Sequence, residues 1–312
     1  MRAAWLAALA ACAPSLDDDT AIVRGPRLLA ARTEPAEVAP GATITASALW
    51  VDPLAGAGLA GGDAPLAWAF CTARKAFREP GPVAAACLAD EAPELVPFGT
   101  GEVATGAVPP TACRQFGPDA PDPVPGEAPG RPVDPDGTGG FYQPVRVRAG
   151  DEHALDQVRI RCGLPGATPA QAAELRAGYT PNANPEIAAM LVGGVDVVAA
   201  AAPVAADAGR TVELALRWPA CEAAPCGGSE PYLWFDPVSR TIARRREAMR
   251  VSWFATAGAF ATGHGGRRED ELATDATGAW TAPPEPGDVQ LWAVLRDDRG
   301  GTAWIAFAIT VR

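Results

Sequence analysis

The chain has 312 residues, which is enough for about two domains on the usual length prior. Its 26 basic and 37 acidic residues give a net charge of −11, which argues against a groove for nucleic acid or anionic lipid. With 48% hydrophobic residues the chain is not disordered throughout, and its 33 glycines and 32 prolines predict short strands joined by turns. No apolar stretch reaches the roughly 18 residues of a membrane-spanning helix. We therefore expect an all-β protein.

The first twelve residues have the parts of a secretory signal. Arg2 is followed by an apolar run, residues 3–11, and then by Cys12. The residues up to the cysteine read LAAC, which resembles the lipobox of bacterial lipoproteins. This resemblance implies cleavage before Cys12, lipidation of Cys12 and a membrane anchor, and Ala13 at the next position favours the outer over the inner membrane. A plain secretory peptide is the alternative.

Residues 13–27 are predicted to form a polar tether between the lipid and the fold. They include Asp17, Asp18 and Asp19 in a row, and such a charge run is usually a solvated spacer. Three adjacent side chains point in different directions, so we do not interpret them as a calcium site.

Six further cysteines predict three disulfides, because an even number in an exported chain is typical of a disulfide framework. Many pairings are open from sequence alone. The pairs we expect are Cys71 with Cys87, Cys113 with Cys162, and Cys221 with Cys226. Zinc would need clustered CxxC or Cys/His spacing, whereas the chain has no CxxC and only 2 histidines. We therefore predict no metal and no cofactor.

Two segments match at a constant offset of 168 residues, and they cover residues 28–50 and 195–218. Each reads as a strand broken by a proline, a turn at a glycine, and a second strand. The matched residues are Pro35 and Pro203, Gly41 and Gly209, Thr43 and Thr211, and Trp50 and Trp218. Proline in sheets is confined to edges and bulges, so the pattern suits a first strand that passes from one sheet of a sandwich to the other.

A tryptophan within a short apolar strand follows each opening, at Trp68 in LAWAFC and at Trp253 in RVSWFAT. Such a residue packs across the core of immunoglobulin-like sandwiches. Each half then ends in a predicted pair of strands, residues 141–148 with 154–162, and the two strands around the turn at residues 297–301.

The last hairpin alternates between an inner and an outer face. Its expected inward residues are Val289, Leu291, Ala293, Leu295, Ile305, Phe307, Ile309 and Val311. Trp292 and Trp304 then fall on the outer face, where aromatic side chains can stack on sugars or anchor a protein partner. A cross-strand pair covered by another part of the chain is the alternative.

These openings, core tryptophans and closing strands resemble the Ig-like and PKD-like domains of bacterial envelope lipoproteins, particularly the Ala- and Arg-rich myxobacterial type. The resemblance implies two immunoglobulin-like β-sandwich domains, at residues 28–165 and 191–312. We expect a long irregular insertion in the first, at residues 72–140, because much of it is low in complexity. Residues 166–190 are expected to form a short helical linker, since Thr168 begins a capping-box pattern.

No complete catalytic constellation is evident. His153, in AGDEHALD, is the best general-base candidate, although a hairpin histidine with polar neighbours is the simpler interpretation. His264 lies in a Gly-rich loop, and Ser229, in CGGSEP, fits a turn beside a disulfide rather than a G-x-S-x-G nucleophile. The run at residues 134–140 begins like a calcium loop but has Val145 where a bidentate glutamate is needed.

We interpret the chain as a lipid-anchored, disulfide-stabilised, non-enzymatic protein of the cell envelope that acts as a structural or protein-binding module. Its expected partners are the membrane, through the lipid on Cys12, and another envelope protein, but not nucleic acid. The first alternative is a carbohydrate- or calcium-dependent adhesion module, for which Trp292 and Trp304 would be exposed. The second is a hydrolase, for which His153 would lie in a deep pocket beside a carboxylate or hydroxyl group.

Overall fold

The computed structural model describes residues 20–53, 66–73, 83–113, 140–164, 166–199, 204–236 and 238–312, and the account below is confined to them. Cys12, the three aspartates of the tether, Pro203 and residues 134–139 of the calcium-like run lie outside these ranges. Strands dominate the described chain, which also holds one α-helix, α2 (Pro169–Gly178). The predicted all-β fold is confirmed.

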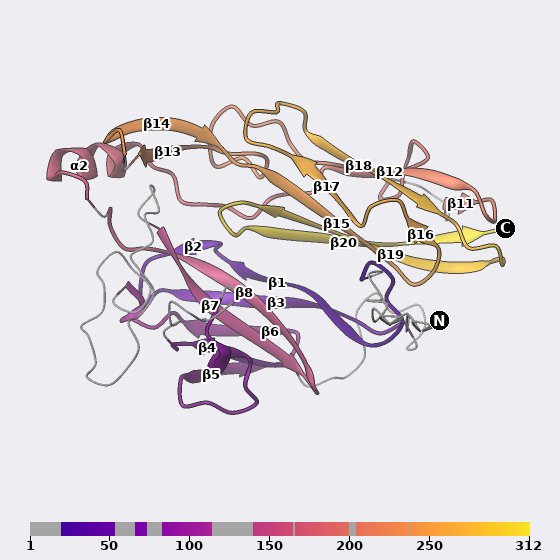
Figure 1. Cartoon of the computed structure of the whole chain (residues 1–312), viewed down its shortest axis with the longest axis horizontal. Coiled ribbons are helices and arrows are strands. Elements are labelled where there is room, and N and C mark those ends of the chain that lie inside the picture. Colours follow the sequence, from indigo (N-terminus) through magenta and orange to yellow (C-terminus); the bar gives the residue numbers. More distant parts are fainter. Residues whose placement is uncertain are drawn as a thin grey trace, which may run out of the picture.

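The first sandwich packs a three-stranded sheet, β1–β3–β6, against a five-stranded sheet, β2–β8–β7–β4–β5 (Figure 1). The strands are β1 Arg27–Glu34, β2 Glu37–Val38, β3 Thr43–Val51, β4 Ala67–Cys71, β5 Leu95–Thr100, β6 Val103–Ala107, β7 Gly140–Ala149 and β8 Glu152–Arg161. A short 3₁₀ helix, η1 (Ala85–Leu88), lies between β4 and β5.

The second sandwich packs two five-stranded sheets, β10–β9–β12–β18–β16 and β11–β20–β19–β15–β17. Its strands are β9 Ala189–Val192, β10 Val195–Asp196, β11 Val204–Ala206, β12 Thr211–Arg217, β15 Met249–Ala255, β16 Ala259–Phe260, β17 His264–Arg267, β18 Asp275–Thr281, β19 Gly287–Asp297 and β20 Thr302–Val311. A separate hairpin of β13 (Pro231–Asp236) and β14 (Thr241–Arg246) extends from one end and lies beside α2 (Figure 1).

The two sandwiches share one strand order. In each, the opening strand is split: β1, or β9 with β10, lies in one sheet, while β2 or β11 lies in the other. The second part runs parallel to the last strand of its sandwich, β2 beside β8 and β11 beside β20. The closing hairpins, β7–β8 and β19–β20, are antiparallel. This arrangement is that of an immunoglobulin-like Greek-key sandwich, and it confirms the predicted sheet-switching first strand.

Glycine makes the turn after each switch. Gly41 has φ +77° and Gly209 has φ +68°, backbone conformations that are strained for residues with a Cβ. The matched glycines in the two openings therefore have the same physical cause, and β3 and β12 re-enter directly after them.

The predicted core tryptophans are confirmed. Trp68 on β4 and Trp253 on β15 are each 1% exposed and lie in the cores of the first and second sandwich. The indole of Trp68 also donates to the carbonyl of Gly101 at 2.8 Å, so its polar atom is satisfied inside. The eight predicted inward residues of the last hairpin are buried, apart from Ile305, which is partly buried against the core.

Two predictions about the first half need correction. Residues 72–140 are not a wholly irregular insertion, because β5 and β6 lie within them and form edge strands of the two sheets. Residues 13–27 are not a solvated tether throughout, because Ala21, Ile22 and Val23 are buried. The amide of Val23 donates to the carbonyl of Ala255 at 2.8 Å, so this segment joins β15 of the second sandwich before the first sandwich begins.

The helix of the predicted linker is confirmed, but the linker is shorter than predicted. Thr168 caps α2 with the predicted capping box, in which Gln171 is the partner, whereas the segment expected to run to residue 190 already enters β9 at Ala189. The three consecutive arginines 244–246 lie on β14.

Candidate functional site

The three disulfides have the predicted pairing. The bonds are Cys71–Cys87, Cys113–Cys162 and Cys221–Cys226. Cys71–Cys87 joins β4 to η1, and Cys113–Cys162 ties the segment after β6 to the end of β8. Within the described ranges no group of three or more His, Cys, Asp or Glu residues could hold a metal ion, and no helix is long and apolar enough to cross a membrane.

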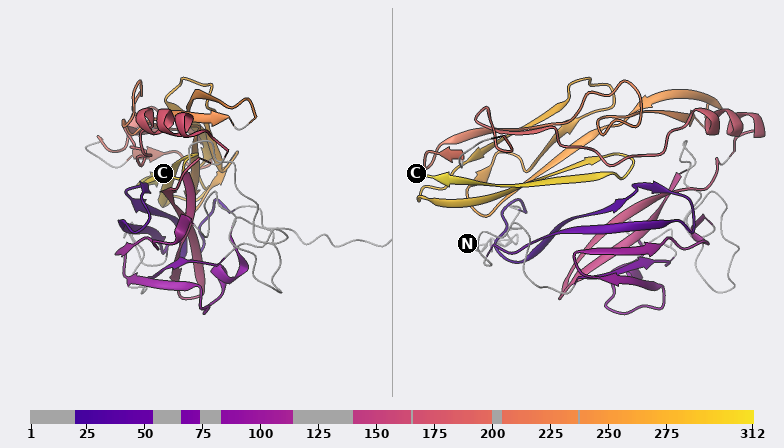
Figure 2. Two further views of the ribbon diagram at one scale, coloured as in Figure 1. Left: turned by 90° about the vertical axis from the view of Figure 1, so that its left-hand side faces the viewer. Right: turned by 180° about the vertical axis from the view of Figure 1, so that it is seen from behind.

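Trp292 and Trp304 lie on the outer face of β19–β20, as the alternation predicts, but this face is covered. Trp292 is 2% exposed and Trp304 is partly buried. Together with Val294 they pack against Leu29 and Leu49 of the first sandwich. The prediction of an open binding face at these tryptophans is therefore wrong, because the first sandwich covers them. Their cross-strand neighbours are Ala306 and Val294 rather than each other. Figures 1 and 2 show β1 beside the closing hairpin of the second sandwich.

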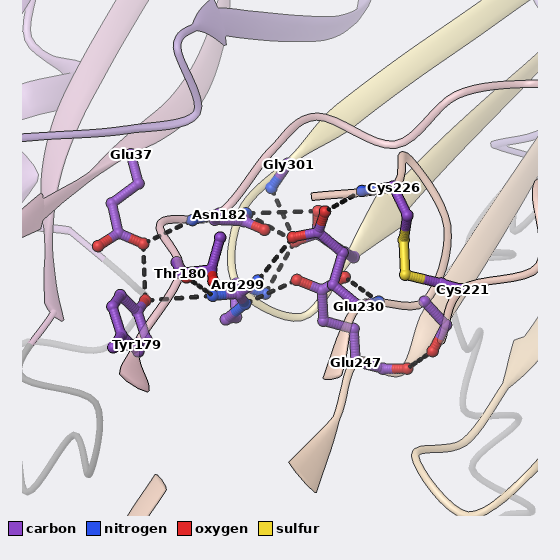
Figure 3. A network of polar contacts seen from close by, with 12 residues as sticks. Glu37, Tyr179, Thr180, Asn182, Cys221, Cys226, Glu230, Glu247, Arg299 and Gly301 are labelled. Atoms are coloured by element: carbon purple, nitrogen blue, oxygen red, sulfur yellow. Dashed lines mark hydrogen bonds and ion pairs between the residues drawn. A yellow bond between two sulfur atoms is a disulfide. The ribbon is translucent and has the colours of Figure 1, made fainter. Parts of the chain in front are cut away.

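A polar cluster continues this contact at the β19–β20 turn, and Arg299 is its centre (Figure 3). The guanidinium, 3% exposed, donates from Nε to Glu247 at 2.6 Å and from Nη2 to Glu230 at 2.9 Å. Its Nη1 lies 3.2 Å from both the Tyr179 hydroxyl and the Thr180 carbonyl oxygen. The arginine thus connects the β13–β14 hairpin with the segment that follows α2.

Asp297 shapes the turn that presents Arg299. Its Oδ1 accepts from the amide of Arg299 at 2.9 Å and from the amide of Gly301 at 2.8 Å. A Cβ at Gly301 would lie 2.0 Å from the Oδ2 of Asp297, so no larger residue fits there without a shift. Asn182 donates to the same carboxylate at 3.3 Å. The predicted turn at residues 297–301 is confirmed, with the aspartate turned inward.

Glu37 brings the first sandwich into the cluster. This buried residue of β2 accepts from the Tyr179 hydroxyl at 2.7 Å and from the amide of Asn182 at 2.9 Å. On its own sandwich it is paired with Arg159, whose Nε lies 3.3 Å from its Oε2. Figure 3 shows Glu37 and Arg299 on either side of the Tyr179–Asn182 segment.

Asn184 makes a second polar connection. Its amide nitrogen donates to the carbonyl of Thr33 and to Glu34, both at 2.8 Å, and its amide oxygen accepts from the backbone of Thr302 at 2.9 Å. The PNANP segment therefore binds β1 on one side and β20 on the other, although sequence alone indicated only a turn.

Burial sets the electrostatics of the cluster. Desolvation raises the pKa of Glu247 well above its usual value, and Asp297 raises it further. Burial also raises the pKa of Asp297 to about 6, against the hydrogen bonds from Gly301 and Arg299. For Arg299 burial alone would lower the pKa, but Glu247 and Tyr179 raise it more, so the arginine stays charged. The positive charge of a single guanidinium thus stabilises the neighbouring carboxyl groups in a junction of low dielectric constant.

The predicted general base does not belong to this cluster. The Nε2 of His153, on β8, lies 3.9 Å from the carboxylate of Asp90, which is itself exposed. His264 is exposed at the start of β17, and Ser229 donates its hydroxyl to the backbone carbonyl of Glu247 beside the Cys221–Cys226 disulfide. In the described chain neither histidine makes a hydrogen bond with a serine or cysteine side chain, and the hydroxyl of Ser229 is engaged in the turn.

Sequence reasoning missed the main members of the junction. Glu37, Asn182, Glu230, Glu247 and Arg299 are far apart in the chain, and each is ordinary in its own sequence context. The available signals were indirect: Asp297 and Arg299 lie in a turn of the best-patterned hairpin, and two asparagines occupy the short PNANP segment between the sandwiches.

No protein-family model matches the sequence, and no curated protein matches it. Several solved structures are similar over most of the chain. The C-terminal domain of the Streptococcus pyogenes antigen I/II-family protein AspA has 11% identity and a TM-score of 0.24, with 92% of this chain and 99% of that chain covered. The C-terminal domain of the Streptococcus agalactiae AgI/II polypeptide BspA has 12% identity and a TM-score of 0.23, with 90% and 99% covered.

The Escherichia coli adhesin FdeC has 12% identity and a TM-score of 0.20, with 91% of this chain and 63% of that chain covered. Values this low carry no conclusion about function. The assignment of an immunoglobulin-like sandwich rests on the strand order described above.

Proposed function

We propose that this chain is an exported, lipid-anchored protein of the cell envelope, in which two firmly joined sandwiches act as one structural or protein-binding module without enzymatic activity. The observation that carries the proposal is the junction: an apolar contact around Trp292 and a buried polar cluster around Arg299 fasten the two sandwiches together. A stiff pair of domains suits a protein that holds a surface at a fixed distance and orientation.

Two further features support an envelope location. All six cysteines beyond Cys12 are paired in disulfides, which form and persist in oxidising compartments. The LAAC sequence before Ala13 resembles a lipobox, and two or three acyl chains would hold the protein on a membrane almost irreversibly. The residue after Cys12 is not the aspartate of inner-membrane retention, so we propose the outer membrane.

The mechanism follows from stiffness and attachment. The lipid on Cys12 fixes the protein to the bilayer, and the first described residues, 20–23, already bind the second sandwich through β15. Both sandwiches would therefore be held close to the anchor rather than strung out one after the other. A partner would bind the outer loops or edges of the joined pair.

The test is the variant Cys12→Ala, expressed in a Gram-negative host with Ser15→Ala as the matched control. Labelled palmitate should be incorporated by the native and the Ser15→Ala proteins, which should sediment with the outer membrane, while Cys12→Ala should carry no label and be released. In-cell cross-linking of all three should then capture an envelope protein that Cys12→Ala loses. Equal fractionation of all three proteins without label would overturn the anchor.

A further inference from the structure

A cavity of about 400 Å³ lies on the second sandwich where β15 begins and β17 and β19 end. Four arginines line it, Arg250, Arg267, Arg268 and Arg296, together with the backbone of Gly265 and Gly266. This gathering of positive charge is unexpected, because the chain as a whole carries −11. A diffuse field would repel anions from such a protein, so any attraction must come from this local arrangement.

Strand register places the arginines. Gly266, Arg250 and Arg296 form one row across β17, β15 and β19. Arg250 and Arg296 are therefore directly opposite each other on neighbouring strands, and like charges in that position destabilise a sheet. The charge of Arg250 adds to burial in lowering the pKa of Arg296.

Gly266 leaves the third place in the row without a side chain. A Cβ there would lie 2.2 Å from the carbonyl oxygen of Met249, so no other residue fits without a shift. The row thus has two adjacent guanidinium groups and, beside them, bare backbone.

Several donors at this cavity lack an acceptor. Arg250 makes no hydrogen bond or ion pair with any described residue. Arg296 makes a long contact of 3.4 Å to the carbonyl of Leu29, and the charge of Asp156 in the first sandwich also acts on it. Arg267 is held by Asp275, 2.7 Å from its Nη2, yet its Nε is buried with no hydrogen-bond partner in the described chain. A buried donor left unpaired is costly, so a ligand with acceptor oxygens would gain from meeting these groups.

Carboxylates oppose part of this charge. Glu271 lies 3.7 Å from Arg267 and Asp270 lies 3.2 Å from Arg268, and Asp297 and Asp298 line the cavity itself. The carboxylate of Asp297 is turned into the junction, where it accepts from the amides of Arg299 and Gly301. Burial raises the pKa of Asp298, so the charged form of this carboxyl group is less favoured than it would be in water.

We propose that this cavity binds a phosphate or sulfate group. Register puts the guanidinium groups of Arg250 and Arg296 on one face of the sheet, whereas Arg267 lies on the other face, where it meets Asp275. Two adjacent guanidinium groups form a suitable donor set for the oxygens of phosphate or sulfate. The cavity volume is in the range of small-molecule sites, and it leaves room for a sugar-sized body beyond the anionic group. The site does not involve Cys12, so its failure would leave the proposed lipid anchor untouched.

The test is calorimetric titration of the full chain in detergent at low chloride, with inorganic phosphate, inorganic sulfate, glucose 6-phosphate and glucose as probes. Both oxyanions should bind and glucose should not. Tighter binding of glucose 6-phosphate than of inorganic phosphate would identify an ester as the source, and equal binding would identify the free ion.

The decisive variant is Arg250→Gln, because Arg250 is exposed, unpaired and outside the junction. It should weaken phosphate binding about tenfold, the effect of losing one charge-assisted pair. Arg244→Gln, on exposed β14, removes the same charge away from the cavity and should bind like the native chain. Absence of binding by the native chain, or equal weakening in both variants at unchanged melting temperature, would overturn the site.

Discussion

The outer faces of the two closing hairpins, β7–β8 and β19–β20, differ sharply although their strand positions correspond. In the first sandwich this face carries charged and polar residues, among them Arg146, Arg148 and Arg159, which pair within their own sandwich. In the second it carries Trp292, Val294 and Trp304, which pack against the other sandwich. The fold thus repeats, but the apolar contact between the sandwiches uses the outer face of the second hairpin together with β1 and β3 of the first sandwich.

The inner faces of the two sandwiches, by contrast, each bury one core tryptophan. Replacing either tryptophan by alanine should therefore lower the stability by a similar amount. Trp68→Ala and Trp253→Ala each remove a fully buried side chain and should lower the free energy of unfolding by about 3–5 kcal/mol. Urea denaturation followed by circular dichroism measures both losses.

The half-buried Trp234, on the β13–β14 hairpin, provides the control, since its ring lies against the guanidinium of Arg245 at 3.7 Å rather than in a sandwich core. Trp234→Ala should cost clearly less. A loss below about 1 kcal/mol at either core position would contradict the equivalence of the two cores.

Removing the central arginine should separate the two sandwiches. Arg299→Ala leaves Glu230 and Glu247 buried without their partner and should lower the free energy of unfolding by about 3 kcal/mol. Differential scanning calorimetry should then resolve two transitions where the native chain shows one.

Arg268→Ala is the matched variant, because that side chain is exposed and its ion pair with Asp270 lies on the surface. It should melt like the native protein. If Arg299→Ala did so as well, the polar cluster would not be what couples the sandwiches.

The stability of the folded chain should also fall as pH rises. Burial raises the pKa of Asp156 to about 7, and its Oδ2 is enclosed without a hydrogen-bond partner in the described chain. Arg296 of the other sandwich interacts with its charge. The folded chain therefore binds a proton that the unfolded chain releases near its ordinary pKa, so stability is greatest at low pH and falls as pH rises towards 7.

Between pH 5 and pH 8 this single group should cost about 2–3 kcal/mol of stability, and the raised pKa of Asp297 acts in the same direction. Asp156→Asn should flatten the pH profile measured by urea unfolding, while Asp151→Asn, at an exposed turn position, should leave its slope unchanged. An unaltered slope in Asp156→Asn would assign the pH dependence to other groups.

Sequence patterns predicted the parts of the fold that depend on local rules. The glycines of the openings, the core tryptophans and the alternation of the last hairpin each have a cause within a few residues, and they were confirmed. Edge strands β5 and β6 were missed because they are short and bury little, so their apolar residues do not alternate with polar ones, and Pro97 and Gly99 interrupt β5.

The junction could not be predicted in the same way. Whether Trp292 faces solvent or protein depends on where another sandwich lies, and the alternation of a strand gives only its side. The partners of Arg299 come from the residue before β13, from the residue after β14 and from the segment after α2, and they come together only when the chain has folded. For this site, the sequence predicted the turn and the side of the strand on which the tryptophans lie, but it did not predict the residues that they contact.

The parallel pairing of the split opening strand has a mechanical consequence. Glu37 and Val38 pair with Arg159 and Ile160, and residues 204–206 pair with residues 309–311, in parallel register. Tension that draws the two ends of either sandwich apart slides these strands along each other, so their hydrogen bonds are loaded together in shear rather than opened one at a time. In each sandwich, the parallel strand pair therefore lies where a pulling force would act.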